Sequence, residues 1–227
     1  MTVNKYVIAC TKDWFYKKNK KIKNKKFLLI TNKKKLNYNY LIKINPRYIF
    51  FPHWSYKIPK IIYKNFICIC FHTSPLPYGR GGSPIQNLIL DNFKESPVNA
   101  IKVEEKIDSG DIILKNKISL KGSLTQIFDR LLIVITKMIF QIIKKKRITY
   151  RKQSGKIKIF KRIKKSKSNI LNQNFEKIEN LHDHIRIRDH KDYPRAYIDL
   201  NKYRLYFSNS EFKKSYLSAK VIIKKKK

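Results

Sequence analysis

The sequence predicts an α/β fold: an open, mostly parallel sheet flanked by helices, followed by a small α+β appendage at the C-terminal end. The first observation is a series of short, continuous apolar runs, which are typical of strands buried on both faces. These runs are residues 6–10, 27–31, 48–51 and 66–71. The second observation is that residues 58–63, between the last two runs, begin like a short helix after Pro59. A strand, a helical crossover and another strand together indicate a parallel sheet.

Capping residues and periodicity predict the later elements. Ser83 and the proline after it suit the start of a helix over residues 85–90. A longer amphipathic helix is predicted over residues 123–143, where Ser123 and Gln126 form a capping box. The remaining predicted elements are strands at 96–103, 112–114, 196–200 and 203–208 and a helix at 175–187.

The length of 227 residues suits one mid-sized domain with a small appendage. We expect a catalytic domain over residues 1–145, because all the predicted parallel strands lie there. Residues 146–170 then form a basic connector, and residues 171–227 a small accessory segment.

The net charge of +38 has two interpretations. Lys and Arg side chains favour a nucleic-acid partner, because they displace counterions from phosphates. Alternatively, the charge is compositional, because Lys, Ile and Asn recur in every part of the chain. Basic residues are densest over residues 144–167 but are not confined there, which favours the compositional interpretation.

Cysteine usage and hydropathy indicate the compartment. The three cysteines, Cys10, Cys68 and Cys70, are odd in number and have no metal-ligand spacing, which favours a reducing environment. The longest apolar run with helical character is too short to cross a bilayer, which takes about 20 residues. Residues 1–10 show no signal-peptide pattern. We therefore expect a cytoplasmic protein without a membrane partner.

Two polar residues follow predicted strands at positions suited to a ligand. His72 ends the apolar run 66–71 and precedes a loop rich in Pro and Gly, and ligands of open parallel sheets bind beyond the carboxyl ends of the strands. Asp108 lies in a later loop beside Gly110. A carboxylate can orient an imidazole and support proton transfer. The plain alternative is a solvated loop histidine and a turn-forming aspartate.

The sequences of the two loops resemble those of the folate-dependent formyltransferase family. That family includes the formyltransferases that act on methionyl-tRNA, on glycinamide ribonucleotide and on sugar nucleotides. Residues 71–86 read Phe-His-Thr-Ser-Pro-Leu-Pro-Tyr-Gly-Arg-Gly-Gly-Ser-Pro-Ile-Gln. They are similar to the family's His motif, its Pro-containing turn and its Arg-Gly loop before a helix. Residues 107–114, Ile-Asp-Ser-Gly-Asp-Ile-Ile-Leu, are similar to its second motif. The resemblance is clear from about residue 44 to 143 and implies the family's variant of the Rossmann fold.

The resemblance implies that His72 and Asp108 are catalytic. The family transfers a formyl group directly from 10-formyltetrahydrofolate to an amine through a tetrahedral oxyanion. His72 would stabilise that oxyanion, and Asp108 would hold the imidazole and help to relay the amine proton.

One position departs from the family pattern. The family's Asn, two residues before the histidine, falls on Cys70, whose thiol is a weak donor. Losing one oxyanion donor would cost about 2.7–4 kcal/mol of transition-state stabilisation unless Asn87 or His53 replaces it. Cys70 could alternatively be a nucleophile, but its place in a buried strand favours a structural thiol.

Two further groups of residues are assigned by the resemblance. Residues 51–59 occupy the position of the family's pterin-binding loop, whose backbone hydrogen-bonds the pterin and whose apolar side chains wall it in. Trp54 could equally be an ordinary packing residue. The expected cofactor-binding residues are His53, Trp54, Ser55, Tyr56, Lys57, Ile58 and Ile107. The expected substrate-loop residues are Ser74, Tyr78, Arg80, Gly81, Gly82, Gln86 and Asn87.

The tail contains His182, His184 and His190, which raises the question of a metal site. On the predicted helix the first two point to different faces, so we expect no metal. Residues 185–207 resemble an accessory segment of some formyltransferases, and substrate binding and homodimer packing both remain open as its role.

Three hypotheses differ in the acceptor. The first is a small-molecule amine, an amino sugar on a nucleotide. The second is methionyl-tRNA, which the basic charge favours but which the short tail, residues 168–227, disfavours. The third is a basic nucleic-acid-binding protein on a degenerate catalytic scaffold, with Cys70 as its main support.

Overall fold

A computed structural model describes residues 5–226, so part of residues 1–10, where the sequence was searched for a signal-peptide pattern, lies outside the described residues. The chain divides into two compact units, which are described separately. The first unit comprises Met1–Gly81, Pro97–Ile118 and Leu131–Ile159. The second comprises Gly82–Ser96, Ser119–Arg130 and Phe160–Lys227. The three segments expected from the sequence stay a prediction.

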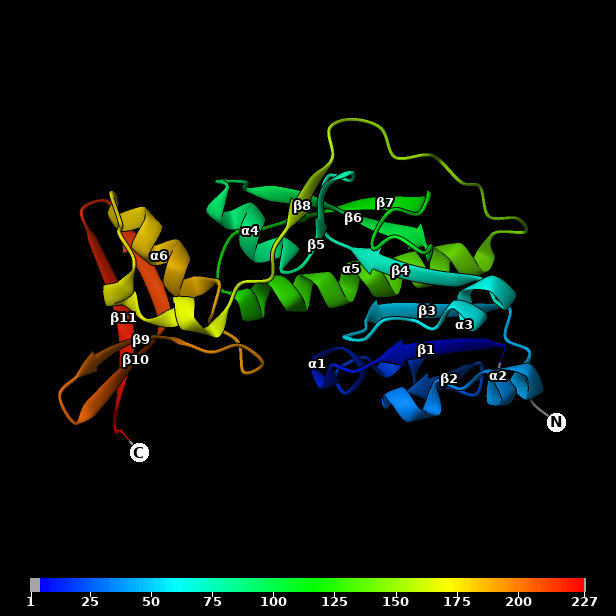
Figure 1. Ribbon diagram of the computed structural model, residues 1–227, viewed down its shortest axis with the longest axis horizontal. Coiled ribbons are helices and arrows are strands. Elements are labelled where there is room, and N and C mark those ends of the chain that lie inside the picture. Colours follow the sequence, from blue (N-terminus) through cyan, green and yellow to red (C-terminus); the bar gives the residue numbers. More distant parts are fainter. Residues whose placement is uncertain (1–4, 227) are drawn as a thin grey trace. The chain divides into compact units, whose positions relative to one another are not determined.

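A six-stranded sheet in the order β2-β1-β3-β4-β6-β7 forms the centre of the first unit (Figure 1). Strands β1 and β2, β1 and β3, and β3 and β4 pair in parallel, whereas β4 and β6 are antiparallel. The predicted mostly parallel α/β fold is therefore confirmed. The strands are β1 (Tyr6–Cys10), β2 (Phe27–Ile30), β3 (Tyr48–His53), β4 (Cys68–His72), β6 (Glu95–Lys102) and β7 (Ile112–Ser119).

Short helices connect these strands. The crossover predicted after Pro59 is α3 (Lys60–Asn65), with Pro59 at its N-cap. Four short elements were not predicted from the sequence: α1 (Asp13–Tyr16), α2 (Tyr38–Ile44) and the 3₁₀ turns Lys20–Ile22 and Lys33–Lys35. These elements are too short to show a helical period, and an asparagine caps α2: the Asn37 side chain accepts from the Tyr40 N–H.

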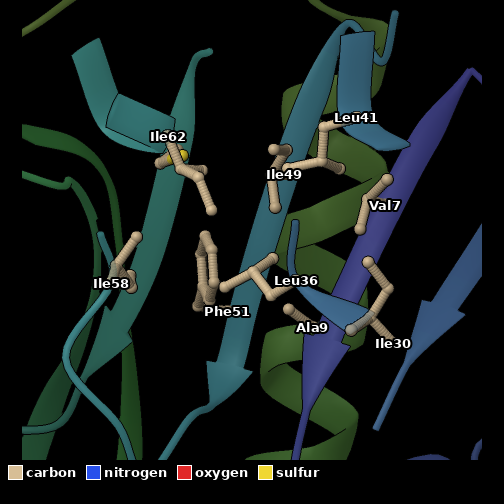
Figure 2. Close-up of a cluster of buried hydrophobic side chains, with 10 residues drawn as sticks. Val7, Ala9, Ile30, Leu36, Leu41, Ile49, Phe51, Ile58 and Ile62 are labelled. Atoms are coloured by element: carbon tan, nitrogen blue, oxygen red, sulfur yellow. The ribbon is translucent and has the colours of Figure 1, made fainter. Parts of the chain in front are cut away.

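Apolar side chains from the parallel strands and their helices form one buried cluster (Figure 2). Full burial of a Val, Leu, Ile or Phe side chain stabilises the fold by about 1.5–3 kcal/mol relative to exposure. The labelled members are Val7, Ala9, Ile30, Leu36, Leu41, Ile49, Phe51, Ile58 and Ile62.

The long helix α5 (Leu124–Lys144) begins with the predicted capping box. The Ser123 N–H donates to Gln126 Oε1 at 2.9 Å, and the Gln126 N–H donates to Ser123 Oγ at 3.3 Å. After α5 the chain returns to β8 (Lys158–Phe160), which pairs with the short strand β5 (Tyr78–Gly81) (Figure 1). Neither β5 nor β8 was predicted, because glycines and lysines conceal any strand pattern.

The second unit contains α4 (Pro84–Leu90), α6 (Ile178–Arg186) and a three-stranded sheet. Ser83 precedes α4 as predicted, but the expected side-chain cap is wrong. Its backbone is left-handed (φ 51°), and its hydroxyl accepts from the Ile163 N–H instead. The sheet consists of β9 (Ala196–Leu200), β10 (Tyr203–Lys213) and β11 (Tyr216–Lys225), in the order β11-β10-β9.

The tail elements differ from prediction in extent. Helix α6 begins three residues later than expected, β10 extends beyond residue 208, and β11 was missed because lysines interrupt its apolar residues. Two 3₁₀ turns, Lys165–Ser168 and Ile170–Asn172, precede α6. Within residues 5–226, no helix is long and apolar enough to span a membrane. Nor do the described histidines, cysteines and carboxylates form any group of three that could hold a metal ion.

Candidate active site

His72 and Asp108 meet in the first unit, as the sequence motifs predicted. His72 is the last residue of β4 and is 6% exposed, while Asp108 lies in the loop between β6 and β7. His72 Nδ1 lies 3.3 Å from Asp108 Oδ2. The same carboxylate oxygen accepts a 3.0 Å hydrogen bond from the Gly81 N–H. Two N–H groups can thus hold one carboxylate oxygen at the carboxyl edge of the sheet.

The second ring nitrogen of His72 lies 2.7 Å from the Gly79 carbonyl oxygen. Each ring nitrogen therefore faces an oxygen that can accept a hydrogen bond. For His72 to bind a developing oxyanion, its Nε2–H must leave the Gly79 carbonyl.

Glycine conformations bring the substrate loop to this pair. Gly79 has φ 80° and Gly81 φ 101°, which side-chain-bearing residues rarely adopt. The Gly79 carbonyl and the Gly81 N–H contact the pair from either side of Arg80. The sequence pattern Gly-Arg-Gly therefore provides an acceptor for the histidine and a donor for the aspartate.

Backbone geometry also fixes the Asp108 loop. Asp108 itself is left-handed (φ 53°), a conformation that aspartate tolerates better than most residues. A Cβ atom on Gly110 would lie 1.8 Å from the Lys102 carbonyl oxygen. Only glycine fits this close approach, which explains the glycine in the second motif.

Cys70 lies two residues before His72 in β4, between Phe51 of β3 and Ile101 of β6. Burial, with the negative charge of Asp108 and then Cys68 adding to it, raises the pKa of the Cys70 thiol well above its ordinary value. A thiol that stays protonated is a poor nucleophile. The geometry therefore favours the structural thiol over the nucleophile.

The two residues expected to replace the family's asparagine have other partners. His53 ends β3 and so lies at the same edge of the parallel sheet as His72; its ring packs edge-on against Trp14, 5.5 Å between centroids. Asn87 belongs to the second unit, where its amide nitrogen donates to the carbonyls of Gly82, Ser83 and Lys161. Its N–H groups are committed to backbone there.

The expected pterin loop follows β3, and its residues divide between core and surface. Ile58 is 8% exposed and belongs to the buried cluster, and Trp54 packs against that cluster with its ring 5.9 Å from Phe51. Ser55 shares a 3.0 Å hydrogen bond with Thr11, while Tyr56 and Lys57 are exposed. Ile107 of the other motif is 73% exposed, which is unusual for a large aliphatic side chain.

The expected substrate-loop residues also differ in exposure. Ser74 is fully buried, and its carbonyl accepts from Asn99 Nδ2 at 2.6 Å, so it anchors the loop to β6. The Tyr78 hydroxyl accepts from Lys158 Nζ at 2.9 Å. Gly82, Gln86 and Asn87 belong to the second unit, where Gln86 is buried.

Gln153, in the segment after α5, is the site residue that the sequence analysis missed. Its Oε1 accepts from Arg80 Nε at 3.0 Å and from Arg80 Nη2 at 2.7 Å. Its Nε2 donates to the Asp108 and Gly110 carbonyls, both at 2.8 Å. No sequence signal marked it, because it lies among lysines in the segment that was expected to be a basic connector.

Comparison with known proteins agrees with this geometry. The family model for the methionyl-tRNA formyltransferase C-terminal domain matches residues 165–224. A solved methionyl-tRNA formyltransferase from Clostridium thermocellum is 41% identical, with a TM-score of 0.90 over 97% of this chain and 99% of that one. A methionyl-tRNA formyltransferase from Thermodesulfovibrio yellowstonii is 29% identical over 194 residues, 82% of this chain and 61% of that protein.

A more distant structural likeness is a 4-N formyltransferase from Francisella tularensis, with 20% identity and a TM-score of 0.64 over 91% of this chain and 97% of that one. At this identity the likeness concerns the fold. The fold and the paired motifs define the class of group-transferring α/β proteins with a His–Asp pair at the sheet edge. Within that class, the chain belongs to the formyltransferase family.

Proposed function

We propose that this protein transfers a formyl group from 10-formyltetrahydrofolate to the α-amino group of methionyl-tRNA. The observation that carries the proposal is the match with the Clostridium thermocellum methionyl-tRNA formyltransferase over nearly the whole of both chains. The chain spans 61% of the length of the Thermodesulfovibrio yellowstonii relative.

The site supports this chemistry through its hydrogen-bonding groups. The amine would attack the formyl carbon and form a new C–N bond, the formyl oxygen would carry the negative charge, and the bond between the formyl carbon and the folate nitrogen would then break. His72, released from Gly79, donates its Nε2–H to that oxygen. Asp108 keeps the imidazole oriented through Nδ1 and accepts the amine proton on its way to the departing folate nitrogen.

The acceptor is changed from our first hypothesis, an amino sugar on a nucleotide. The short tail had disfavoured methionyl-tRNA, but this chain covers 99% of the solved Clostridium thermocellum chain of that name. The matched residues 165–224 moreover correspond to a methionyl-tRNA formyltransferase domain. The likeness to a 4-N formyltransferase supports the fold alone. The amino-sugar acceptor is therefore kept as an alternative that the experiment below can detect.

The experiment offers radiolabelled 10-formyltetrahydrofolate with three acceptors in parallel: methionyl-tRNA, free methionine and an amino-sugar nucleotide. We expect label on methionyl-tRNA. Label on the sugar nucleotide instead would contradict the proposed acceptor while keeping the formyl donor. Failure to transfer to any acceptor, with nucleic-acid binding and an intact fold, would support the degenerate scaffold and contradict the proposal.

A further inference from the structure

Gln153 joins the two motif loops through both ends of one side chain. Its carbonyl oxygen accepts two bonds from the Arg80 guanidinium, at 3.0 and 2.7 Å. Its amide nitrogen donates to the carbonyls of Asp108 and Gly110, at 2.8 Å each. Among neutral side chains, only a primary amide carries both two donors and an acceptor on one planar group. The residue type therefore matches the demands of this position.

The backbone that carries Gln153 is fixed to the same loop. Two residues earlier, the Ile112 N–H donates to the Arg151 carbonyl at 2.8 Å, and the Arg151 N–H donates to the Ile112 carbonyl at 2.9 Å. This antiparallel bridge joins the start of β7 to the segment that returns from α5. Gln153 is thus held beside the Asp108 loop by its main chain as well as by its side chain.

The bonds form a closed circuit around the catalytic pair. The Asp108 carbonyl is held by Gln153, and the Asp108 carboxylate is held by His72 and by the Gly81 N–H. Arg80 precedes Gly81 and is itself bonded to Gln153. A shift of Gln153 would therefore move Asp108, because Gln153 holds the Asp108 carbonyl. It would also move the Gly81 N–H, because Gln153 holds the neighbouring Arg80.

We propose that Gln153 is a positioning residue that sets the place of the Asp108 carboxylate relative to His72. The role rests on the proposed formyl transfer. Gln153 reaches the chemistry only through Asp108 and Arg80. Misplacement of a reacting group by about 1 Å can cost on the order of a hundredfold in rate, so a residue outside direct reach can control turnover.

Two substitutions separate the halves of this contact, and a neighbour provides the control. Gln153→Met keeps the approximate side-chain length and removes every hydrogen bond. Gln153→Glu keeps acceptors for Arg80 but replaces the donors to the two carbonyls by a repelling carboxylate. Lys152→Met makes a matched change at the exposed residue next to it.

Steady-state kinetics with the wild-type acceptor gives the first readout. We expect kcat to fall about tenfold or more in both Gln153 variants, with KM for the formyl donor nearly unchanged and Lys152→Met like wild type. A wild-type kcat in Gln153→Glu would overturn the role of the hydrogen bonds that the Gln153 amide nitrogen donates to the Asp108 and Gly110 carbonyls. A lower folded fraction with unchanged kcat per folded molecule would overturn positioning altogether, because it would show support of the fold alone.

Hydrogen exchange of the Gly81 amide gives a readout that needs no activity, since this N–H donates to Asp108. We expect faster exchange in Gln153→Met than in Lys152→Met. Equal exchange in the two variants would overturn the proposal. If the wild-type protein transfers no formyl group, the proposed function fails, whereas the exchange measurement still decides whether Gln153 holds Asp108.

Discussion

Two clusters of buried polar side chains use their charges in different ways. Around His72 and Asp108, a carboxylate faces an imidazole and a glycine N–H at the edge of the sheet. Around α6 in the second unit, Arg186 donates to the carbonyls of Leu120 and Gly122.

The other charged groups near α6 also form hydrogen bonds with backbone groups. Arg188 donates to the carbonyls of His184 and Lys167, and the Asp189 carboxylate accepts from the Asn209 N–H. Buried charge by itself therefore does not mark a catalytic site. The difference lies in the partners. An imidazole faces a carboxylate in the first cluster, whereas in the second the guanidinium groups donate mainly to backbone carbonyls, with Asp183 as a further partner of Arg186.

The largest effect should come from His72→Ala. Removing the imidazole takes away both the oxyanion donor and the partner of Asp108, so kcat should fall by about 10²–10⁴-fold. The thermal midpoint should change much less. Formylation rates and a melting curve on the same preparation measure both, and retained turnover would show that the first cluster is structural.

Arg186→Met should have the opposite result. Arg186 Nε lies 2.6 Å from Asp183 Oδ1, and both side chains are largely buried. Removing one partner leaves an unpaired buried charge, which costs about 3–5 kcal/mol of unfolding free energy. Urea unfolding measures the loss, and kcat per folded molecule should stay near wild type. A stable but inactive variant would give the α6 cluster a functional role.

Acid should weaken the α6 cluster. Burial, with the charge of Arg188 adding to it, lowers the pKa of His184 from 6.5 to about 4, so the folded form holds this ring neutral. The resulting stability is complete above pH 6.5 and is lost as the pH falls towards 4, because the unfolded chain then binds a proton that the folded chain refuses. The loss amounts to about 3 kcal/mol.

Hydrogen exchange of the α6 amides between pH 7 and 4 measures this loss, and His184→Gln is the control. The glutamine does not titrate, so its variant should lose less stability over that interval. Equal acid lability of the two proteins would assign the effect to another group.

The smallest effect should come from Cys70→Ala. Because burial raises the pKa of this thiol, we expect it to stay protonated and to play no nucleophilic role, so kcat should stay within about threefold of wild type. The same assay measures it. Complete loss of activity would instead make Cys70 a nucleophile and change the mechanism to a two-step transfer.

The sequence predicts those features that depend on burial or on local capping. Strands β1 and β9 have the predicted bounds, and the capping box of α5 is confirmed, because continuous apolar runs and Ser–Gln spacing are local signals. The two motifs predicted the His–Asp pair, but the strand ends alone did not. Strand β6 runs antiparallel to β4 with Lys102 opposite Ile69, so the loop after β6 starts away from the carboxyl end of β4 and turns back to bring Asp108 within 3.3 Å of His72.

Features that depend on long-range hydrogen bonds could not be predicted. Gln153 is 45 residues from Asp108 and has no periodic or motif signal. The sequence pattern predicted that the Ser83 hydroxyl caps the helix that follows it. In the structure this hydroxyl instead accepts a hydrogen bond from the Ile163 N–H, 80 residues away. Such contacts follow from where the chain returns, which no local pattern encodes.

The central claim is that the His72–Asp108 pair performs formyl transfer, and Asp108→Asn tests it most directly. Asparagine keeps the size and can still accept from Gly81, but it removes the negative charge that orients the imidazole. A single-turnover assay with labelled 10-formyltetrahydrofolate and methionyl-tRNA should show transfer by the wild-type protein and at least about a hundredfold slower transfer by the variant. Equal single-turnover rates in the two folded proteins would contradict the account.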